Sequence, residues 1–363
     1  MKIGIAGAGL LGRLLAFQLS KAGHEVEVFD PALHAEARGA AGWTAAGMLC
    51  PVAELQCADE HVFKLGLRSL ELWPEIAAQL GVDVEVRREG SLLFAHRGDE
   101  GAAARTIDFL TRKAPPGFEP QALTMEQVRE LEPAVQGPAH AWMLPGEGSL
   151  HTVQAMHALA SAASAAGARW HWGSAVERLD AGALWVAGER HAFDWVFDVR
   201  GVGARPDLPV RGVRGEVFTL HAPGLSLRRP LRLLHARHAV YLVPRAGDQV
   251  VVGASSIESE DRSPVSVRTT VELLAAAHSI VPALAEARIV MAEANLRPAL
   301  PDNLPRIDTQ SGLTRINGLY RHGWLIAPAM VEEALCHCGL DPQSSDEAGT
   351  GPGLRVKPAM RTL

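Results

Sequence analysis

The chain has few cysteines, no excess of basic residues and no long apolar run. Its four cysteines, Cys50, Cys57, Cys336 and Cys338, are too few and too unevenly spaced for a disulfide framework, so a reducing cytoplasm is the expected setting. The net charge of −6 argues against nucleic acid or an acidic membrane as a partner. No apolar run approaches the roughly 20 residues of a membrane span. Arg13 interrupts the apolar N-terminal stretch, which argues against a signal peptide.

The overall composition is that of an ordinary globular protein, with 47% hydrophobic and 21% charged residues. A length of 363 residues normally corresponds to about two domains. The run Cys336-His337-Cys338 contains metal-binding residue types, but it lacks the spacing of a zinc knuckle and a second ligand pair. We therefore expect neither a metal site nor a catalytic nucleophile.

The first thirty residues have the pattern of a strand, a helix and a second strand. Residues 2–6 are nearly all apolar, residues 10–21 carry leucines on one helical face, and residues 26–29 form another apolar run that ends at Asp30. In dinucleotide-binding proteins an acidic residue at this place accepts hydrogen bonds from a ribose hydroxyl group. The arrangement predicts a site for an ADP-ribosyl group and does not distinguish NAD from FAD.

Three glycines between the first strand and the helix, Gly7, Gly9 and Gly12, have G-x-G-x-x-G spacing. In this pattern the first glycine permits a tight turn, the second lets a pyrophosphate approach the backbone, and the third lets the helix pack on the sheet. The N-terminus of the helix offers unpaired N–H groups to the phosphates. A second small-residue segment, residues 42–49, either lies against a large flat ligand or begins a tightly packed helix.

Further along the chain, β-rich stretches alternate with helical ones. Two strands are expected on either side of Glu89-Gly90 as a hairpin. Thr152 is expected to cap the N-terminus of a helix, and Pro328 to lie in the first turn of another. Residues 336–363 are rich in glycine, proline, serine and charge, which predicts a disordered tail.

Five stretches of the chain together resemble the FAD-dependent D-amino-acid oxidase superfamily, and within it the glycine oxidases of thiamine biosynthesis. They are GIAGAGLLG with Asp30, WTAAGMLCP with Glu54, RGVRGE at 211–216, YLVPRAGDQVVVGAS at 241–255, and LRPALPDNLPRI with NGLYRHGWLIAPA between 296 and 329. Many flavoproteins share the first stretch, whereas the last three are more specific and follow the order found in the family. The resemblance extends over residues 1–335.

The resemblance implies an α/β fold, with a Rossmann-like FAD-binding domain and an inserted α+β substrate domain built on a mostly antiparallel sheet. The FAD-binding domain would comprise residues 1–80, 145–210 and 296–335, and the substrate domain residues 81–144 and 211–295. FAD is the implied cofactor. The residues expected to bind it are Gly7, Gly9, Gly12, Asp30, Ala45, Ala46, Gly47, Met48 and Gly323.

The resemblance also implies oxidative deamination of glycine or another small amino acid. A hydride would pass from Cα to the flavin N5, oxygen would reoxidise the flavin, and the imine would supply thiazole synthesis or be hydrolysed. Tyr241 and Arg297 match the positions that hold the substrate carboxylate, and Arg321 matches an arginine near the flavin. Arg297 follows a predicted strand, and strand ends are where ligands collect. Glu54 is expected to be a local cap or a loop acid and not a catalytic base, and His322 receives no role.

Two other functions are compatible with the same residues. A D-amino-acid dehydrogenase of this fold would pass electrons to a quinone or another carrier instead of oxygen. A catalytically impaired FAD-binding protein is the second alternative, because residues 197–201 depart from the usual apolar strand with small residues at its end. A homo-oligomer is possible in each case.

Overall fold

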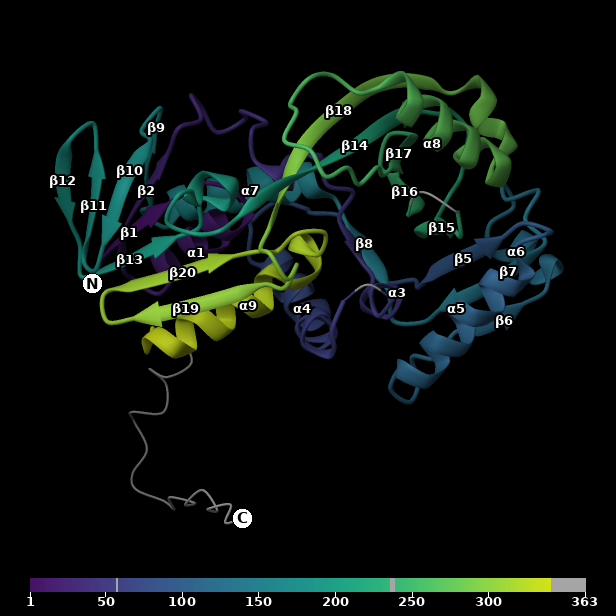
Figure 1. Cartoon of the computed structure of the whole chain (residues 1–363), viewed down its shortest axis with the longest axis horizontal. Helices are drawn as coiled ribbons and strands as arrows, with labels where there is room; N and C mark the ends of the chain where they lie inside the picture. The colour runs from purple at the N-terminus through teal and green to yellow at the C-terminus, as the bar shows by residue number, and fades with distance from the viewer. Residues whose placement is uncertain (57, 236–238, 341–363) are drawn as a thin grey trace, which may run out of the picture.

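The structure, a computed structural model, describes residues 1–56, 58–235 and 239–340. Figure 1 shows two main sheets: one at the left contains the N-terminal strand, and a larger one, which includes two long strands, extends to the right. This arrangement confirms the predicted α/β fold. None of the helices in these ranges combines the length and apolarity needed to cross a membrane.

The first main sheet has six strands in the described residues. In spatial order they are β19 (Arg306–Gln310), β20 (Leu313–Asn317), β13 (Trp195–Asp198), β1 (Lys2–Ala6), β2 (Glu25–Asp30) and β9 (Arg169–Trp172). Neighbouring strands are parallel except for β19 and β20. From β1 the chain continues to β2 on one side, and it returns much later to β13 on the other. Ligands of open α/β sheets bind at such a switch point, outside the carboxyl ends of the strands.

The second main sheet has eight strands in the described residues and is antiparallel except where β5 meets β15. In spatial order they are β18 (Arg288–Ala299), β14 (Arg211–His221), β17 (Gln249–Gly253), β16 (Val240–Arg245), β15 (Leu231–Leu233), β5 (Ser91–Ala95), β7 (His140–Leu144) and β6 (Gln121–Leu123). The expectation of a mostly antiparallel sheet is confirmed.

Helices and two small sheets complete the described fold. The helices are α1 (Leu10–Lys21), α2 (Ala41–Thr44), α3 (Pro51–Glu54), α4 (Glu60–Ala78), α5 (Glu100–Lys113), α6 (Met125–Leu131), α7 (Thr152–Ala165), α8 (Val267–Ile280) and α9 (Gly323–Cys338), with 3-10 helices η1 (Gly201–Ala204) and η2 (Pro282–Glu286). The small sheets are β10 (Val176–Asp180), β11 (Ala183–Val186) and β12 (Glu189–Ala192), and β3 (Met48–Leu49), β8 (Gly148–Leu150) and β4 (Val86–Arg87).

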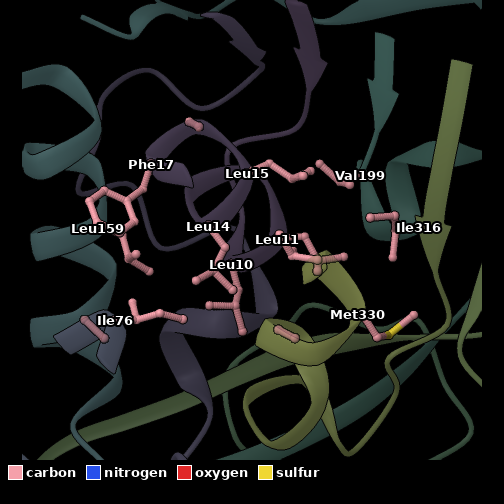
Figure 2. Close-up of a cluster of buried hydrophobic side chains, with 14 of the residues drawn as sticks. Leu10, Leu11, Leu14, Leu15, Phe17, Ile76, Leu159, Val199, Ile316 and Met330 are labelled. Atoms are coloured by element: carbon pink, nitrogen blue, oxygen red, sulfur yellow. The ribbon is translucent and has the colours of Figure 1, made fainter. Parts of the chain in front are cut away.

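Helix α1 is held in place by its leucines, which recur at helical spacing. Leu14 and Leu15 are fully buried, and Figure 2 shows the leucines of α1 beside Leu159 of α7, Ile76 of α4 and Met330 of α9. Burying one leucine side chain stabilises a fold by about 2 kcal/mol. This packing fixes the N-terminus of α1 at the carboxyl end of β1.

Strand β18 connects the large sheet to the segment around α2. Glu293 accepts two hydrogen bonds from the Arg38 guanidinium, at 2.6 and 2.8 Å. The Asn295 side-chain amide lies 3.2 Å from both the Ala40 carbonyl and the Thr44 hydroxyl oxygen. The large sheet is therefore joined to the segment around α2 by specific polar contacts.

The predicted hairpin at Glu89-Gly90 is wrong. Strand β4 pairs with β8, whereas β5 pairs with β7 and β15. All five residues of β5 are buried. Such a strand lies in the interior of a sheet and needs a partner on each side, and both partners come from distant parts of the chain.

Two predicted helix positions also change. Helix α7 begins at Thr152, its N-cap is His151, and the Thr152 hydroxyl donates to the Ala45 carbonyl at 3.0 Å. Pro328 lies inside α9 instead of in its first turn. A proline there leaves the carbonyl four residues earlier without its helical donor. The Trp73 indole N–H donates to that carbonyl, Trp324 O, at 2.8 Å.

The expected tail does not begin at Cys336. Helix α9 continues to Cys338, and Gly339 ends it in the left-handed conformation with φ +67°. The rest of the expected tail, residues 341–363, lies outside the described residues.

Strand β18 runs through Arg297 and Pro298, so the predicted strand end at Arg297 is also wrong. We propose the two main sheets as the centres of the two expected domains; a boundary at residue 296 would cut β18.

Candidate functional site

A cavity of about 830 Å³ is lined by residues from both main sheets. Its volume lies within the range of about 300–1,000 Å³ that is usual for ligand sites. It reaches from the turn after β1 to the face of the large sheet. The predicted site residues that line it are Gly7, Gly9, Asp30, Ala45, Ala46, Gly47, Met48, Tyr241, Arg297, Arg321 and Gly323.

Each of the three glycines in the turn after β1 is required for a different structural reason. Gly7 has φ +109°, and a Cβ atom there would lie 2.7 Å from the Val199 carbonyl oxygen. Gly12 does not line the cavity; a Cβ atom there would collide with the Gly7 carbonyl, so the close packing of α1 on the turn requires glycine. Gly9 has φ −71°, and the nearest described neighbour of a Cβ atom there would be the Ala40 Cβ at 3.6 Å. Gly9 is therefore the glycine whose missing side chain leaves room for a ligand, which fits a pyrophosphate.

Asp30 lies at the end of β2 and faces the same end of the cavity. One of its carboxylate oxygens accepts from the Ala8 N–H at 2.6 Å, and the other accepts from the Ala32 N–H at 2.8 Å. A carboxylate has about four acceptor positions. Asp30 thus stabilises the glycine turn and keeps acceptor capacity for a ribose hydroxyl group.

Arg13 supports the turn and was not identified from the sequence. Its side chain is 1% exposed and donates to the carbonyl oxygens of Ala8, Met156 and Ala35 at 2.7–2.8 Å. It also lies over the Trp43 ring at 5.0 Å. Burial lowers the pKa of Arg13 to about 10, so it stays charged at neutral pH. An arginine on a helix is usually solvent-exposed, which explains why no pattern in the sequence identified it.

The small-residue segment at residues 42–49 was predicted either to lie against a ligand or to begin a helix, and the structure shows both features. Ala41–Thr44 form the short helix α2, and both this helix and the residues from Ala45 to Met48 line the cavity. Gly47 has φ +67°, and a side chain there would collide with the Leu150 carbonyl. The Arg245 guanidinium donates to the Ala46 carbonyl. The backbone of this segment is therefore held firmly against one wall.

Tyr241 and Arg297 lie on the large sheet, and two glycines make room for them. A Cβ atom at Gly215 would collide with the Arg297 guanidinium, and one at Gly253 would lie 2.5 Å from the Tyr241 hydroxyl. Gly215 belongs to β14 and Gly253 to β17, the two strands between β18 and β16. Glycines inside strands often mark a close approach of this kind, and they are a sequence signal that could have located these side chains.

The charges around Arg297 and Tyr241 favour an anionic ligand. Burial lowers the pKa of Arg297, and the nearby positive charge of Arg321 adds to this effect. Burial raises the pKa of Tyr241, so its hydroxyl remains a donor at neutral pH. Within the described ranges, the hydrogen bonds of the Arg297 side chain go to backbone carbonyls. A carboxylate in the cavity would therefore gain both a positive charge and a hydroxyl donor.

Glu54, which was expected to be a local cap or a loop acid, lies at the end of α3 and lines the same cavity. Its carboxylate lies 3.2 Å from the His322 Nδ1 atom and 3.5 Å from the Arg232 guanidinium. Burial alone would raise the pKa of Glu54, but the nearby His322 ring and the Arg232 guanidinium lower it below its usual range. Glu54 is therefore ionised at neutral pH. Glu54 lies in α3, His322 at the start of α9 and Arg232 in β15. Because these elements are far apart in the sequence, no local pattern predicts that the three residues meet.

The unusual stretch at residues 197–201 contains an ion pair between Asp198 and Arg200. Two atoms of the Arg200 guanidinium lie 2.9 Å from the Asp198 carboxylate, and the guanidinium also binds Asp207 at 2.6 Å. Asp198 is fully buried. Arg200 lines the cavity without leaving an unpaired charge there, so this departure does not block the site.

The chain is similar to known proteins over nearly its whole length. It is 38% identical to the Rhizobium etli oxidoreductase ThiO, assigned to thiamine biosynthesis, over 92% of this chain and 95% of that protein. It is 30% identical to the glycine oxidase of Geobacillus kaustophilus, over 90% and 89% of the two chains. The crystal structure of glycine oxidase from Geobacillus kaustophilus matches with a TM-score of 0.81 at 28% identity, covering 93% and 94%.

A family model described as DAO, FAD dependent oxidoreductase, matches residues 2–334. This match covers both main sheets and the cavity between Gly9 and Arg297. It confirms the predicted resemblance and the predicted cofactor. The chain therefore belongs to the DAO family of FAD-dependent oxidoreductases.

Proposed function

We propose that the protein oxidises glycine or another small amino acid in thiamine biosynthesis. The observation that carries this proposal is the position of Arg297 and Tyr241, which face one cavity on the large sheet and offer a guanidinium and a hydroxyl donor. The names of the relatives, ThiO and glycine oxidase, support it. The remaining space beside these two residues extends to the glycine turn, where the cofactor would be held.

The proposed roles of the residues follow from their chemistry. Gly7, Gly9 and Asp30 would hold the ADP-ribosyl half of FAD, with Gly12 packing α1 beneath it. The cofactor residues proposed nearer the flavin are Ala45, Ala46, Gly47, Met48 and Gly323. When bound, FAD supplies the acceptor for two electrons. The chain itself holds and orients the substrate.

Arg297 would bind the substrate carboxylate through its planar fork, with Tyr241 donating a further hydrogen bond and Arg321 adding positive charge. The substrate would lose a hydride from Cα and a proton from nitrogen, which leaves an imine. Water would convert the imine to an oxo acid and ammonia, or the imine would pass to thiazole synthesis. Oxygen is the proposed electron acceptor, which is supported by a relative named as an oxidase. The cytoplasm is the proposed compartment.

A homo-oligomer is also proposed. Large apolar side chains are exposed on α8 and on the edge strand β18, namely Val267, Val271, Ile289, Val290 and Met291. Exposed apolar clusters are common at interfaces between subunits. Light scattering during size-exclusion chromatography would give the subunit number, and a monomer at micromolar concentration would contradict this proposal.

Anaerobic mixing with amino acids tests the proposed activity directly. Glycine should bleach the visible absorbance of the protein-bound oxidised flavin, and admitting oxygen should restore it. Oxygen-independent reoxidation by a quinone alone would favour the dehydrogenase alternative. A flavin that no amino acid reduces would favour the impaired alternative and contradict the proposal.

A further inference from the structure

The side chain of Arg297 is oriented by two backbone carbonyls. Its Nη1 atom donates to the Ser255 carbonyl at 3.0 Å and lies 3.4 Å from the Arg214 carbonyl. Carbonyl oxygens accept hydrogen bonds but carry no net charge. The guanidinium is thus oriented without having its charge neutralised. Its orientation depends on whatever fixes these two carbonyls.

Ser255 is fully buried and is tied to Glu216 by three hydrogen bonds. The Ser255 N–H donates to the Glu216 carbonyl at 3.3 Å, and the Glu216 N–H donates to the Ser255 hydroxyl oxygen at 3.0 Å. That hydroxyl in turn donates to the Glu216 carboxylate at 3.4 Å. Ser255 therefore links Glu216 to Arg297.

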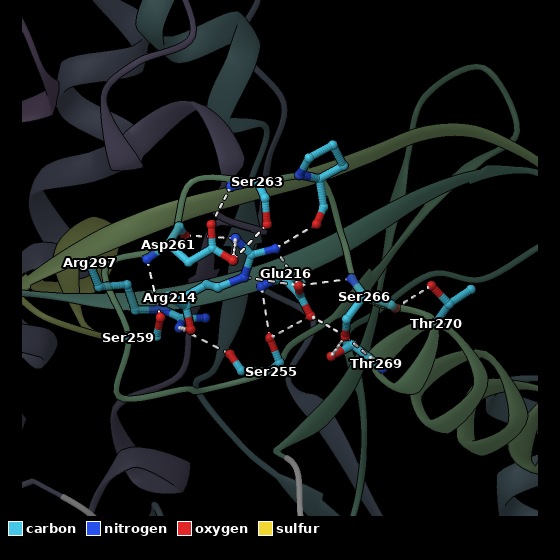
Figure 3. Close-up of polar contacts among 11 residues, drawn as sticks. Arg214, Glu216, Ser255, Ser259, Asp261, Ser263, Ser266, Thr269, Thr270 and Arg297 are labelled. Carbon is cyan, nitrogen blue, oxygen red and sulfur yellow. Dashed lines mark hydrogen bonds and ion pairs between the residues drawn. The ribbon is translucent and has the colours of Figure 1, made fainter.

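The Arg214 carbonyl also accepts from the Ile257 N–H at 2.9 Å, and the side chain of the same arginine binds Glu216. Two nitrogens of Arg214 lie 3.0 and 2.6 Å from one oxygen of the Glu216 carboxylate. Arg214 also donates to the carbonyls of Asp261 and Pro264, at 2.7 and 2.8 Å. Figure 3 shows this network, with Glu216 at its centre and Arg297 at one side.

The charge of Glu216 is retained although the side chain is fully buried. Burial would raise the pKa of Glu216, but hydrogen bonds from Thr269, Arg214 and the Ser266 N–H lower it below its usual value. The carboxylate thus neutralises Arg214, which is itself 4% exposed. A buried pair of this kind is costly to break, because one charge is left without compensation.

We propose that Glu216 is a positioning residue for substrate binding. Through Ser255 and Arg214 it holds the Arg297 guanidinium in the orientation that receives the substrate carboxylate. Glu216 does not line the cavity and does not touch the substrate. This inference rests on the proposed function, because it assumes that Arg297 binds a carboxylate.

Binding of acetate to the FAD-loaded protein tests the inference, with the change in flavin absorbance as the readout. Acetate carries only the carboxylate, so its Kd reports the Arg297 site without the chemical step. Glu216→Gln keeps the shape and removes the charge. It should raise the Kd for acetate roughly tenfold while leaving the FAD content unchanged. Ser255→Ala should act in the same direction, and it decides the question if Glu216→Gln fails to fold.

Glu132→Gln is the matched control. Glu132 is also fully buried, and it binds the Arg229 guanidinium at 3.0 Å. It makes no hydrogen bond to Arg297, Ser255 or Arg214 in the described residues. This variant should lower the Tm as Glu216→Gln does, but leave the Kd for acetate at the wild-type value. A merely structural role for Glu216 would make the two variants alike.

The variant Arg297→Leu distinguishes the positioning role of Glu216 from the proposed binding of the substrate carboxylate by Arg297. If Arg297→Leu binds acetate as the wild type does, the carboxylate lies elsewhere and both ideas fail. If Arg297→Leu weakens acetate binding but Glu216→Gln and Ser255→Ala do not, Arg297 remains the binding group and Glu216 has no positioning role.

Discussion

At the scale of single residues, we expect substitution of Arg297 to reduce activity toward amino acids. Arg297→Leu should retain FAD but lose roughly ten- to a hundredfold in kcat/KM for glycine, because a charge-assisted hydrogen bond contributes about 1.5–3 kcal/mol. Arg297→Lys should recover only part of the loss, since a point charge cannot replace the planar fork. Steady-state oxygen consumption measures both variants. Arg178→Leu, which removes an exposed guanidinium paired with Asp180, is the control; equal activity of Arg297→Leu and this control would refute the assignment.

The pKa of Glu54 gives a pH dependence of stability with a definite sign. Its folded-state pKa is lowered, mainly by His322 and Arg232 against the effect of burial. The ionised form is therefore favoured in the folded state, and the stability it contributes is present above the unfolded-state pKa of about 4.3 and declines as the pH falls below it. Glu54→Gln should lower the Tm clearly at pH 7 and less at pH 3.5. Calorimetry at both pH values measures this, and a Tm difference that grows on acidification would contradict it.

At the scale of elements, the glycines inside β14 and β17 set the shape of the substrate end. Gly215→Ala should push the Arg297 guanidinium aside, because the new methyl group would occupy its place. We expect a tenfold or larger loss in kcat/KM for glycine, by roughly one lost charge-assisted bond, with FAD content unchanged. Gly101→Ala in α5, where the nearest atom is Arg105 Nη1 at 3.5 Å, should have no effect on kcat/KM. Equal rates in the two variants would show that Arg297 does not need this space.

Elements formed by neighbouring residues were predictable from the sequence, and those assembled from distant residues were not. The turn from Gly7 to Gly12 joins one strand to the next helix and is held by Asp30 at the end of the following strand, so a short stretch of sequence predicts its structure. The error at Glu89-Gly90 arose because the partners of β5 come from distant segments. Glu54 and His322 meet only because α3 and the start of α9 pack together. The family resemblance identified Tyr241 and Arg297, but it did not reveal that Gly215 and Gly253 make room for them.

At the scale of the whole molecule, FAD should stabilise the fold, because the cavity is lined by both main sheets. A ligand at 100 times its Kd adds about 2.7 kcal/mol to the free energy of unfolding, which should raise the Tm by several degrees. Protein stripped of FAD should therefore melt earlier and recover when FAD is added, as differential scanning fluorimetry would show. Gly9→Val should show no such recovery, since its side chain would fill the pyrophosphate position. NAD stabilising the wild type in place of FAD would contradict the cofactor assignment.

Strand β18 has a consequence for protein engineering. This strand pairs with β14 along its whole length, binds Arg38 through Glu293, and carries Asn295 and Arg297 to the cavity. A chimaera that takes its substrate sheet from a relative would have to inherit β18 whole, together with the Arg38 to Thr44 segment that Asn295 binds. Crossover points placed after Ala299 should yield functional hybrids more often than points placed within Arg288–Ala299, and a library of such hybrids would reveal the difference.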